Sequence, residues 1–169
     1  GLVHRLDRPV GGAMVFAKTS KAASRLSEQI RTREFDKSYI AVVHGVPKQM
    51  SGTLRHYLVK NEATNTVSVT KSTYEGKEAS LDYEVKASKD GLSLVQIRLN
   101  TGRPHQIRVQ FADIGHPLFG DQKYGTAMNK PGMQLALWSA QIGFRHPTLK
   151  QWMSFISAPP KEYPWDIFI

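Results

Sequence analysis

The sequence predicts an α+β domain built on a mixed, mainly antiparallel sheet with flanking helices and loops. Several segments rich in β-branched and aromatic residues are separated by short turn signals, a pattern typical of antiparallel strands. Two further segments carry apolar residues at helical spacing. A chain of 169 residues is long enough to bury one core, so we assign residues 1–169 to a single domain.

The first part of the chain is predicted to contain one helix and most of the sheet. Apolar residues at helical spacing indicate an amphipathic helix over 19–30, with Ser20 as its N-cap. A strand follows over 37–44 and ends before Gly45. Turn signals separate three further predicted strands, at 66–70, 80–86 and 92–99. We expect these three strands to form an antiparallel meander.

A second, shorter helix is predicted after Gly102. Pro104 suits its first position, Gly115 suits its C-terminal cap, and an apolar stripe lies between them at Ile107, Phe111 and Ile114. Strands near 134–144 and 151–157 complete the sheet, which the following prolines interrupt.

The composition indicates a soluble protein with a polyanionic partner. The chain has 23 Lys and Arg against 14 Asp and Glu, a formal net charge of +9. It has no cysteine, which excludes disulfides, thiolate zinc sites and a cysteine nucleophile. It shows no membrane-spanning apolar run and no signal peptide, so we expect a cytoplasmic location and no membrane partner. Because it begins with Gly1 instead of Met, we expect a fragment or a processed chain.

The first candidate for chemistry is Asp7, which lies between Arg5 and Arg8 in a segment that runs into a Pro and Gly-rich turn. Two nearby guanidinium groups favour an ionised carboxylate, and a turn can present it to a cleft as a nucleophile or base. The alternative is that Asp7 caps a helix or pairs with an arginine to hold the turn.

The second candidate is the segment 101–108, in which the predicted helix places His105 and Arg108 on one face. A fixed guanidinium could bind a carboxylate such as Asp7 bidentately, or instead contact phosphate. On the predicted strand, Tyr39 could stack on a base and Lys37 could meet phosphate, although core packing would equally explain a tyrosine there.

Other site classes find little support. His4 with Asp7, or His105 with His116, has a spacing that metal ligands sometimes show, but no HExxH or Cys/His cluster occurs, so we expect no metal. There is no Walker loop, strand-borne GxGxxG or GxSxG elbow, and we expect no cofactor. A glycosidase pair formed by Asp7 and Asp121 remains an alternative.

The order of the motifs resembles the RluA-type pseudouridine synthase family over nearly the whole chain. The matching segments are His4-Arg5-Leu6-Asp7, Lys37-Ser38-Tyr39, Thr101 to Arg108, Gly120 to Gly125, Leu135-Ala136-Leu137, Phe144 to Pro147 and Ala158-Pro159-Pro160. Members of this family usually carry N-terminal strands before the aspartate segment, and we expect this domain to lack them. The resemblance implies a pseudouridine-synthase-like catalytic domain.

The resemblance also implies roles for single residues. Asp7 corresponds to the catalytic aspartate, Tyr39 to the aromatic that stacks on uracil, and Arg108 to the ion-pair partner of the aspartate. Arg5 corresponds to the arginine that fills the place of the flipped-out base. We assign the remaining site residues to RNA or substrate binding: His4, Arg8, Lys37, Arg103, His105 and Leu137.

These assignments predict an isomerase that converts uridine to pseudouridine in ribosomal or transfer RNA. The aspartate could attack the anomeric carbon or abstract a sugar proton, and both routes stay open. The partner is structured RNA, whose target base must be flipped out of its stack, and we expect the protein to be a monomer. The runner-up is a noncatalytic RNA-binding module of the same fold.

Overall fold

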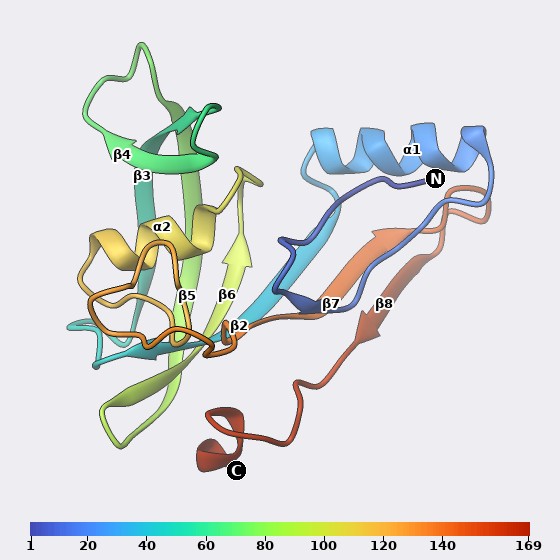
Figure 1. Cartoon of the computed structure of the whole chain (residues 1–169). Helices are drawn as coiled ribbons and strands as arrows, with labels where there is room; N and C mark the ends of the chain where they lie inside the picture. The colour runs from blue at the N-terminus through green and yellow to red at the C-terminus, as the bar shows by residue number, and fades with distance from the viewer.

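A computed structural model describes residues 1–169 and shows one eight-stranded sheet with two α-helices. Figure 1 shows the sheet bending between a group formed by β3 to β6 with α2 and a group formed by β7, β8 and α1. The elements in chain order are β1 (Gly11–Gly12), α1 (Ser20–Arg31), β2 (Asp36–His44), β3 (Ser51–Asn61), β4 (Thr66–Thr70), β5 (Lys77–Lys89), β6 (Leu92–Leu99), α2 (Gln106–Asp113), β7 (Leu137–Arg145), β8 (Trp152–Ile156) and the 3-10 helix η1 (Trp165–Phe168).

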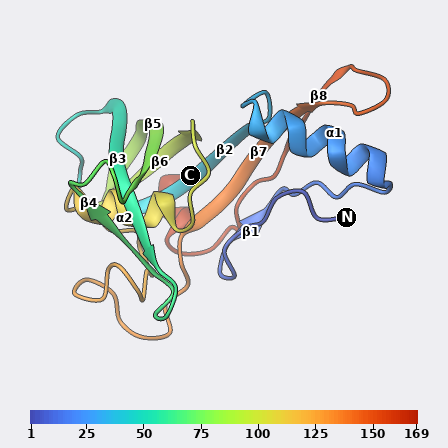
Figure 2. The same cartoon turned by 90° about the horizontal axis from the view of Figure 1, so that it is seen from above.

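The strands follow the order β1-β7-β2-β6-β5-β3-β4, and β8 pairs with β7. Every pairing is antiparallel except that of β1 with β7. The predicted mixed, mainly antiparallel α+β fold is therefore confirmed. Strand β2 joins the two groups, because it pairs with β6 of the first and with β7 of the second, and the view from above in Figure 2 shows it running between them.

The predicted meander is wrong in its order, because β3 was missed and lies between β4 and β5. This strand alternates exposed and partly buried positions along most of its length, and Gly52, Arg55 and His56 interrupt its apolar residues. A half-exposed strand of this kind carries no continuous apolar signal. The other strand predictions hold, although β5 extends beyond the predicted 80–86 in both directions.

Helix α1 starts one residue later than predicted and is capped by Thr19, whose hydroxyl accepts a hydrogen bond from the Ala22 amide at 3.1 Å. The predicted cap at Ser20 is therefore wrong. The buried face of α1, centred on Leu26, packs with Phe35 against Ile142 and Phe144 of β7. This packing fixes the position of the turn between α1 and β2.

Helix α2 begins at Gln106, so Pro104 lies outside it and not at its first position as predicted. His105 is its N-cap residue and adopts a left-handed backbone with φ of 53°. At the other end Gly115 has φ of +85°, which confirms the predicted glycine-terminated helix. Phe111 and Ile107 of α2 pack into the largest core cluster, against strands β2, β5 and β6. Neither α-helix combines the length and hydrophobicity that a membrane span requires.

Candidate active site

Asp7 lies in a turn that precedes strand β1 and is anchored to the sheet by it. Its carbonyl accepts a hydrogen bond from the Val10 amide at 2.9 Å, which closes the turn. The following strand β1 pairs with Trp138 and Ser139 of β7. A side-chain carbon on Gly12 would lie 2.2 Å from the Ser139 carbonyl oxygen, so only glycine allows the strands to approach this closely. The Asp7 side chain itself retains 30% of its exposure.

The predicted site residues converge on one pocket beneath this turn. Eight of the ten line the same pocket: Arg5, Asp7, Lys37, Tyr39, Arg103, His105, Arg108 and Leu137. They come from the N-terminal segment, β2, the loop between β6 and α2, α2 itself and β7. The remaining two, His4 and Arg8, line the wider cleft that surrounds the pocket. Residues far apart in the chain therefore meet at one place.

Arg108 contacts Asp7, but its principal partner is Asp121. Its Nε and Nη2 atoms donate hydrogen bonds to the two carboxylate oxygens of Asp121 at 3.0 and 2.9 Å, whereas Nη1 lies 3.8 Å from Asp7 Oδ2. The possibility that Arg108 binds Asp7 bidentately is thus wrong. Asp121 instead holds the arginine in place through Nε and Nη2, and Nη1 remains directed toward Asp7.

Asp121 is fully buried and accepts two further hydrogen bonds, from the amides of Lys123 and Tyr124. Burial alone would raise its pKa, but the hydrogen bonds from Arg108 and from these amides outweigh burial and hold the pKa below its usual value. Asp121 does not line the pocket that contains Asp7. It therefore orients Arg108 and is not placed to act as the second acid of a glycosidase pair.

Tyr124 is a site residue that the sequence reasoning missed. Its ring lies against the Arg108 guanidinium, and the distance from Arg108 Cζ to the ring centroid is 5.1 Å. Its hydroxyl accepts a hydrogen bond from the Val67 amide of β4 at 3.0 Å and is also hydrogen-bonded to Nδ1 of His105. The segment 120–125 was identified as a family motif, but its sequence alone did not predict that the tyrosine links β4 to His105 in the pocket.

Tyr39 is buried in the core yet lines the pocket. Burial, and then the negative charge of Asp7, raises the pKa of Tyr39 to about 12. The phenol is therefore neutral at physiological pH and cannot serve as a general base there. The ring offers a flat apolar surface beside the Asp7 carboxylate.

Two basic residues in the pocket are available to an anion. Burial lowers the pKa of Lys37, and no carboxylate lies within ion-pair distance of its ammonium. Arg103 donates through Nε to the Glu78 carbonyl at 2.8 Å but forms no ion pair. An unpaired cation that is partly withdrawn from water binds an incoming anion strongly.

His4 is packed into the interior more than the sequence suggested. Its Nε2 accepts a hydrogen bond from the Val15 amide at 3.1 Å, and its ring lies 5.4 Å from that of Phe35. Burial, with a smaller effect of the Lys37 charge, lowers the pKa of His4. These contacts favour a neutral imidazole that supports the Asp7 turn, while its assignment to RNA binding stays a prediction.

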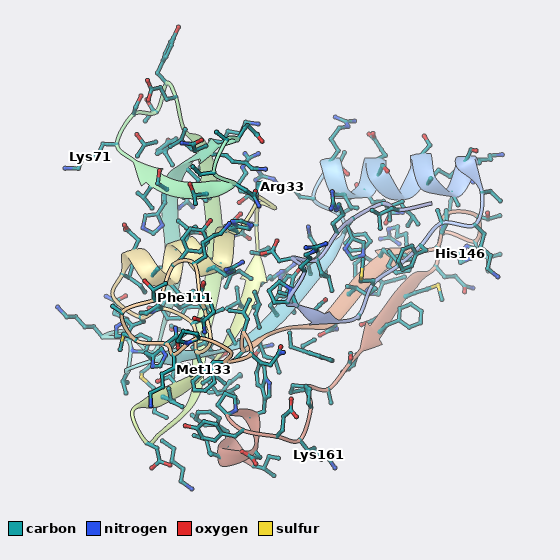
Figure 3. All side chains as sticks on the ribbon, viewed as in Figure 1. Arg33, Lys71, Phe111, Met133, His146 and Lys161 are labelled. Carbon is teal, nitrogen blue, oxygen red and sulfur yellow. The ribbon has the colours of Figure 1, made fainter.

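The wider cleft around the pocket is strongly basic. Asp7 is its only acidic lining residue, whereas its cations come from both sides of the cleft: Arg5, Arg8, Lys37, Lys60, Arg103, Arg108 and Lys123. Lys123 also donates to the Asn65 carbonyl at 2.7 Å, which ties the tip of the β3–β4 hairpin to the site. Figure 3 shows side chains reaching into the space between this hairpin and α1. Such a cleft concentrates a polyanion next to a single carboxylate.

Comparisons with known proteins find one family. The profile of the family described as RNA pseudouridylate synthase matches residues 1–113. Similar sequences include an uncharacterized RNA pseudouridine synthase of Aquifex aeolicus, 34% identical over 96% of this chain and 54% of its own length. The ribosomal large subunit pseudouridine synthase C of Buchnera aphidicola is 33% identical over 96% of this chain and 53% of its own length. The chain thus spans about half the length of these curated relatives.

Solved structures show the same fold. Human RNA pseudouridylate synthase domain containing 1 superimposes with a TM-score of 0.81 and 25% identity, over 94% of this chain and 68% of that protein. Human RNA pseudouridylate synthase domain containing 4 gives a TM-score of 0.80 at 24% identity, over 95% of this chain and 71% of that protein.

Proposed function

The chain belongs to the RNA pseudouridylate synthase family, and we propose that it isomerises uridine to pseudouridine in structured RNA. The observation that carries the proposal is the placement of the Asp7 carboxylate in a pocket beside Tyr39 and Arg108, inside a cleft otherwise lined by cations. Because relatives are named as ribosomal large subunit synthases, we propose ribosomal RNA as the first substrate to test, with transfer RNA as the second.

The reaction needs one well-placed carboxylate and no redox change. The bond from uracil N1 to the sugar C1′ breaks, the uracil turns, and its C5 bonds to the same C1′ while the C5 proton is lost and N1 gains one. A carboxylate at Asp7 can attack C1′ and later depart, or can abstract a sugar proton and return it. Either route ends with Asp7 unchanged, so both require it.

The surroundings of Asp7 suit this chemistry. The positive charge of Arg108 lies 3.8 Å from the Asp7 carboxylate and helps to orient it. Apolar side chains of Val10, Ile107 and Leu137 line the pocket and limit the entry of water. Water at the exposed C1′ would hydrolyse the nucleoside instead of allowing the uracil to reattach.

A stacked uracil reaches this pocket only if it leaves the RNA helix, which costs a few kcal/mol. Tyr39 offers a face on which the flipped uracil can stack. Arg5 lines both the pocket and the wider cleft, where its side chain can fill the gap that the base leaves. Tyr39 thus replaces the lost stacking for the flipped uracil, and Arg5 replaces it for the bases that remain in the helix.

Tyr39→Phe is expected to keep most of the activity, whereas Tyr39→Leu is expected to lower kcat/KM by about 5- to 150-fold. The reason is that phenylalanine retains the stacking face, which contributes roughly 1–3 kcal/mol per base, and the leucine does not. Single-turnover measurement of pseudouridine formation checks this. Equal losses in both variants would instead assign a proton-transfer role to the hydroxyl group.

RNA binding is expected to weaken steeply as salt increases. The seven cations of the cleft can contact phosphates, and each contact formed adds about 0.7–0.9 to the slope of log K against log salt concentration. Fluorescence anisotropy with a labelled RNA stem-loop over a salt series measures this slope. A flat profile would contradict the electrostatic role of the cleft.

The experiment that tests the proposed function is incubation of the protein with ribosomal and transfer RNAs that contain uridine, followed by carbodiimide mapping of pseudouridine. New pseudouridine that depends on Asp7 supports the synthase and identifies its target. Salt-sensitive binding without any modification would favour a noncatalytic RNA-binding module.

A further inference from the structure

We propose that a second groove, next to the active-site cleft, binds the phosphates of the RNA segment that flanks the target uridine, with Arg33 as its outer contact. This inference rests on the proposed function. The groove lies between the end of α1, the neighbouring strands β2, β3, β5 and β6, and the loop after β6. We call it the flanking groove.

The flanking groove is continuous with the cleft that contains Asp7. Lys37, Gly102 and Arg103 line the pocket, the wider cleft and the flanking groove alike. A side-chain carbon on Gly102 would lie 3.1 Å from the Lys37 ammonium, which shows how closely this loop approaches the lysine. A strand whose target nucleotide sits over Asp7 can therefore continue past Lys37 without leaving a basic surface.

The flanking groove has a surplus of cations that the protein does not neutralise. Two of its three acidic side chains form ion pairs, Asp36 with Arg98 and Glu78 with Arg55, and the third, Asp82, is hydrogen-bonded to the neutral side chains of Thr53 and Asn100. By contrast, Arg33, Lys37 and Arg103 take part in none of the ion pairs of the molecule. Arginine binds phosphate through two parallel N–H bonds, so free guanidinium groups lining one groove fit an RNA backbone.

Arg33 also occupies a backbone position that normally favours glycine. The amide of Arg33 donates to the Ile30 carbonyl and that of Glu34 to the Gln29 carbonyl, a hydrogen-bond pair that ends α1 with Arg33 at φ of 63°. The left-handed conformation is unfavourable for a residue with a Cβ. A long cation held there at an energetic cost points to a use for its side chain.

The rest of the chain offers a matched comparison. Among the non-glycine residues with positive φ, only Arg33 and Lys150 are not Asn, Asp or His, the residue types that tolerate this conformation best. Lys150 lies in the turn between β7 and β8, near His146. Figure 3 labels Arg33 on the cleft side of α1 and His146 at the far end of that helix. Lys150 is therefore a cation with similar backbone strain but outside the cleft and the flanking groove.

The test compares Arg33→Gly with Lys150→Gly in the complete 169-residue chain. Each substitution removes one positive charge and relieves one left-handed side chain, so both variants are expected to fold with a melting temperature no lower than that of the unmodified protein. The probe is a labelled RNA stem-loop of mixed sequence with single-stranded extensions on both sides, and the readout is affinity over a salt series.

Arg33→Gly is expected to weaken binding about five- to eightfold at 0.1 M salt and to reduce the salt slope by about 0.7–0.9, the effect of losing one phosphate contact. Lys150→Gly is expected to leave both quantities unchanged. On a stem-loop trimmed of its extensions, the difference between Arg33→Gly and the unmodified protein is expected to disappear.

Three results would overturn the inference in distinguishable ways. If the unmodified protein binds the RNA with a steep salt slope and Arg33→Gly matches it, the flanking groove is wrong and the proposed function stands. If the unmodified protein binds no RNA at any salt concentration, the proposed function fails and the flanking groove fails with it. Equal weakening by Arg33→Gly and Lys150→Gly would also count against the groove, because it would show only a general effect of net charge.

Discussion

Asp7→Asn is expected to lower the rate of pseudouridine formation by at least about 10⁴-fold, the order of loss seen when a nucleophile or its base is removed from an enzyme. Asparagine has nearly the same shape, so the turn closed by the hydrogen bond between Val10 and the Asp7 carbonyl is retained. What disappears is the negative charge, which both routes through the sugar require. Carbodiimide mapping of the RNA after long incubation measures the residual rate.

The control for this variant is Asp90→Asn. Asp90 lies at the tip of the β5–β6 turn with φ of 55°, a conformation that asparagine also tolerates, and it lines neither the pocket nor the wider cleft. It should therefore be fully active. RNA affinity of Asp7→Asn should be equal or higher, because the substitution removes the only acidic side chain of a basic cleft. Normal pseudouridine formation by Asp7→Asn and Asp7→Ala would remove the basis of the proposed mechanism.

Asp121→Asn is expected to lower the free energy of unfolding by about 3 to 5 kcal/mol, because the buried Arg108 guanidinium loses its principal charge partner and keeps only the longer contact with Asp7. The expected mechanism is loss of the hydrogen bond that Arg108 Nε donates at 3.0 Å, because the asparagine NH2 group cannot accept it, together with loss of the negative charge beside an arginine whose side chain is only 9% exposed. Activity should fall as well, since Arg108 then lacks the support that holds it beside Asp7. Urea denaturation and single-turnover kinetics measure the two effects separately.

A surface pair provides the matched control. Asp36 pairs with Arg98 at 2.9 Å, but the two side chains keep 42% and 62% of their exposure to solvent. Asp36→Asn should therefore change the free energy of unfolding by less than about 1 kcal/mol. The double variant Arg108→Gln with Asp121→Asn should be more stable than the two single losses together predict, because neither partner is then left as an unpaired charge. Additive losses would mean that the pair is not coupled.

The lowered pKa of Asp121 predicts that the protein loses stability in acid. The folded pKa of Asp121 lies below the ordinary value of 3.8, so the unfolded chain binds its proton first as the pH falls. The stabilisation from Asp121 is fully present above the unfolded pKa and is lost as the pH falls through the folded pKa. Asp121→Asn should lack this part of the acid dependence.

Much of the fold could be predicted from local patterns, and the errors have physical causes. The bounds of β4 and β6 match the predictions because strong turn signals delimit them. By contrast, β3 is half exposed and carries charged residues, so its place between β4 and β5 depends on pairing that no local pattern encodes. Register between distant strands is decided by tertiary packing.

At the candidate site, too, some features could be predicted from the sequence and others could not. The sequence placed Asp7, Tyr39 and Arg108 at one site, and they line one pocket. It did not predict that Asp121 would take the bidentate contact with Arg108, because two carboxylates compete for one guanidinium and only the three-dimensional arrangement decides which is buried behind it. The sequence also assigned no role to Tyr124, whose hydroxyl is hydrogen-bonded to the Val67 amide of β4 and to His105.

The docking of β1 against β7 has a consequence for the order in which the chain acquires function during synthesis. The Asp7 turn is held by contacts to β7, and 126 residues separate Ala13 from its hydrogen-bond donor Ser139. At ordinary translation rates those residues take roughly 6 to 25 s to emerge. Until then the Asp7 carboxylate has no sheet beside it, so on the proposed function the nascent protein should remain inert toward the RNA of the ribosome that is making it.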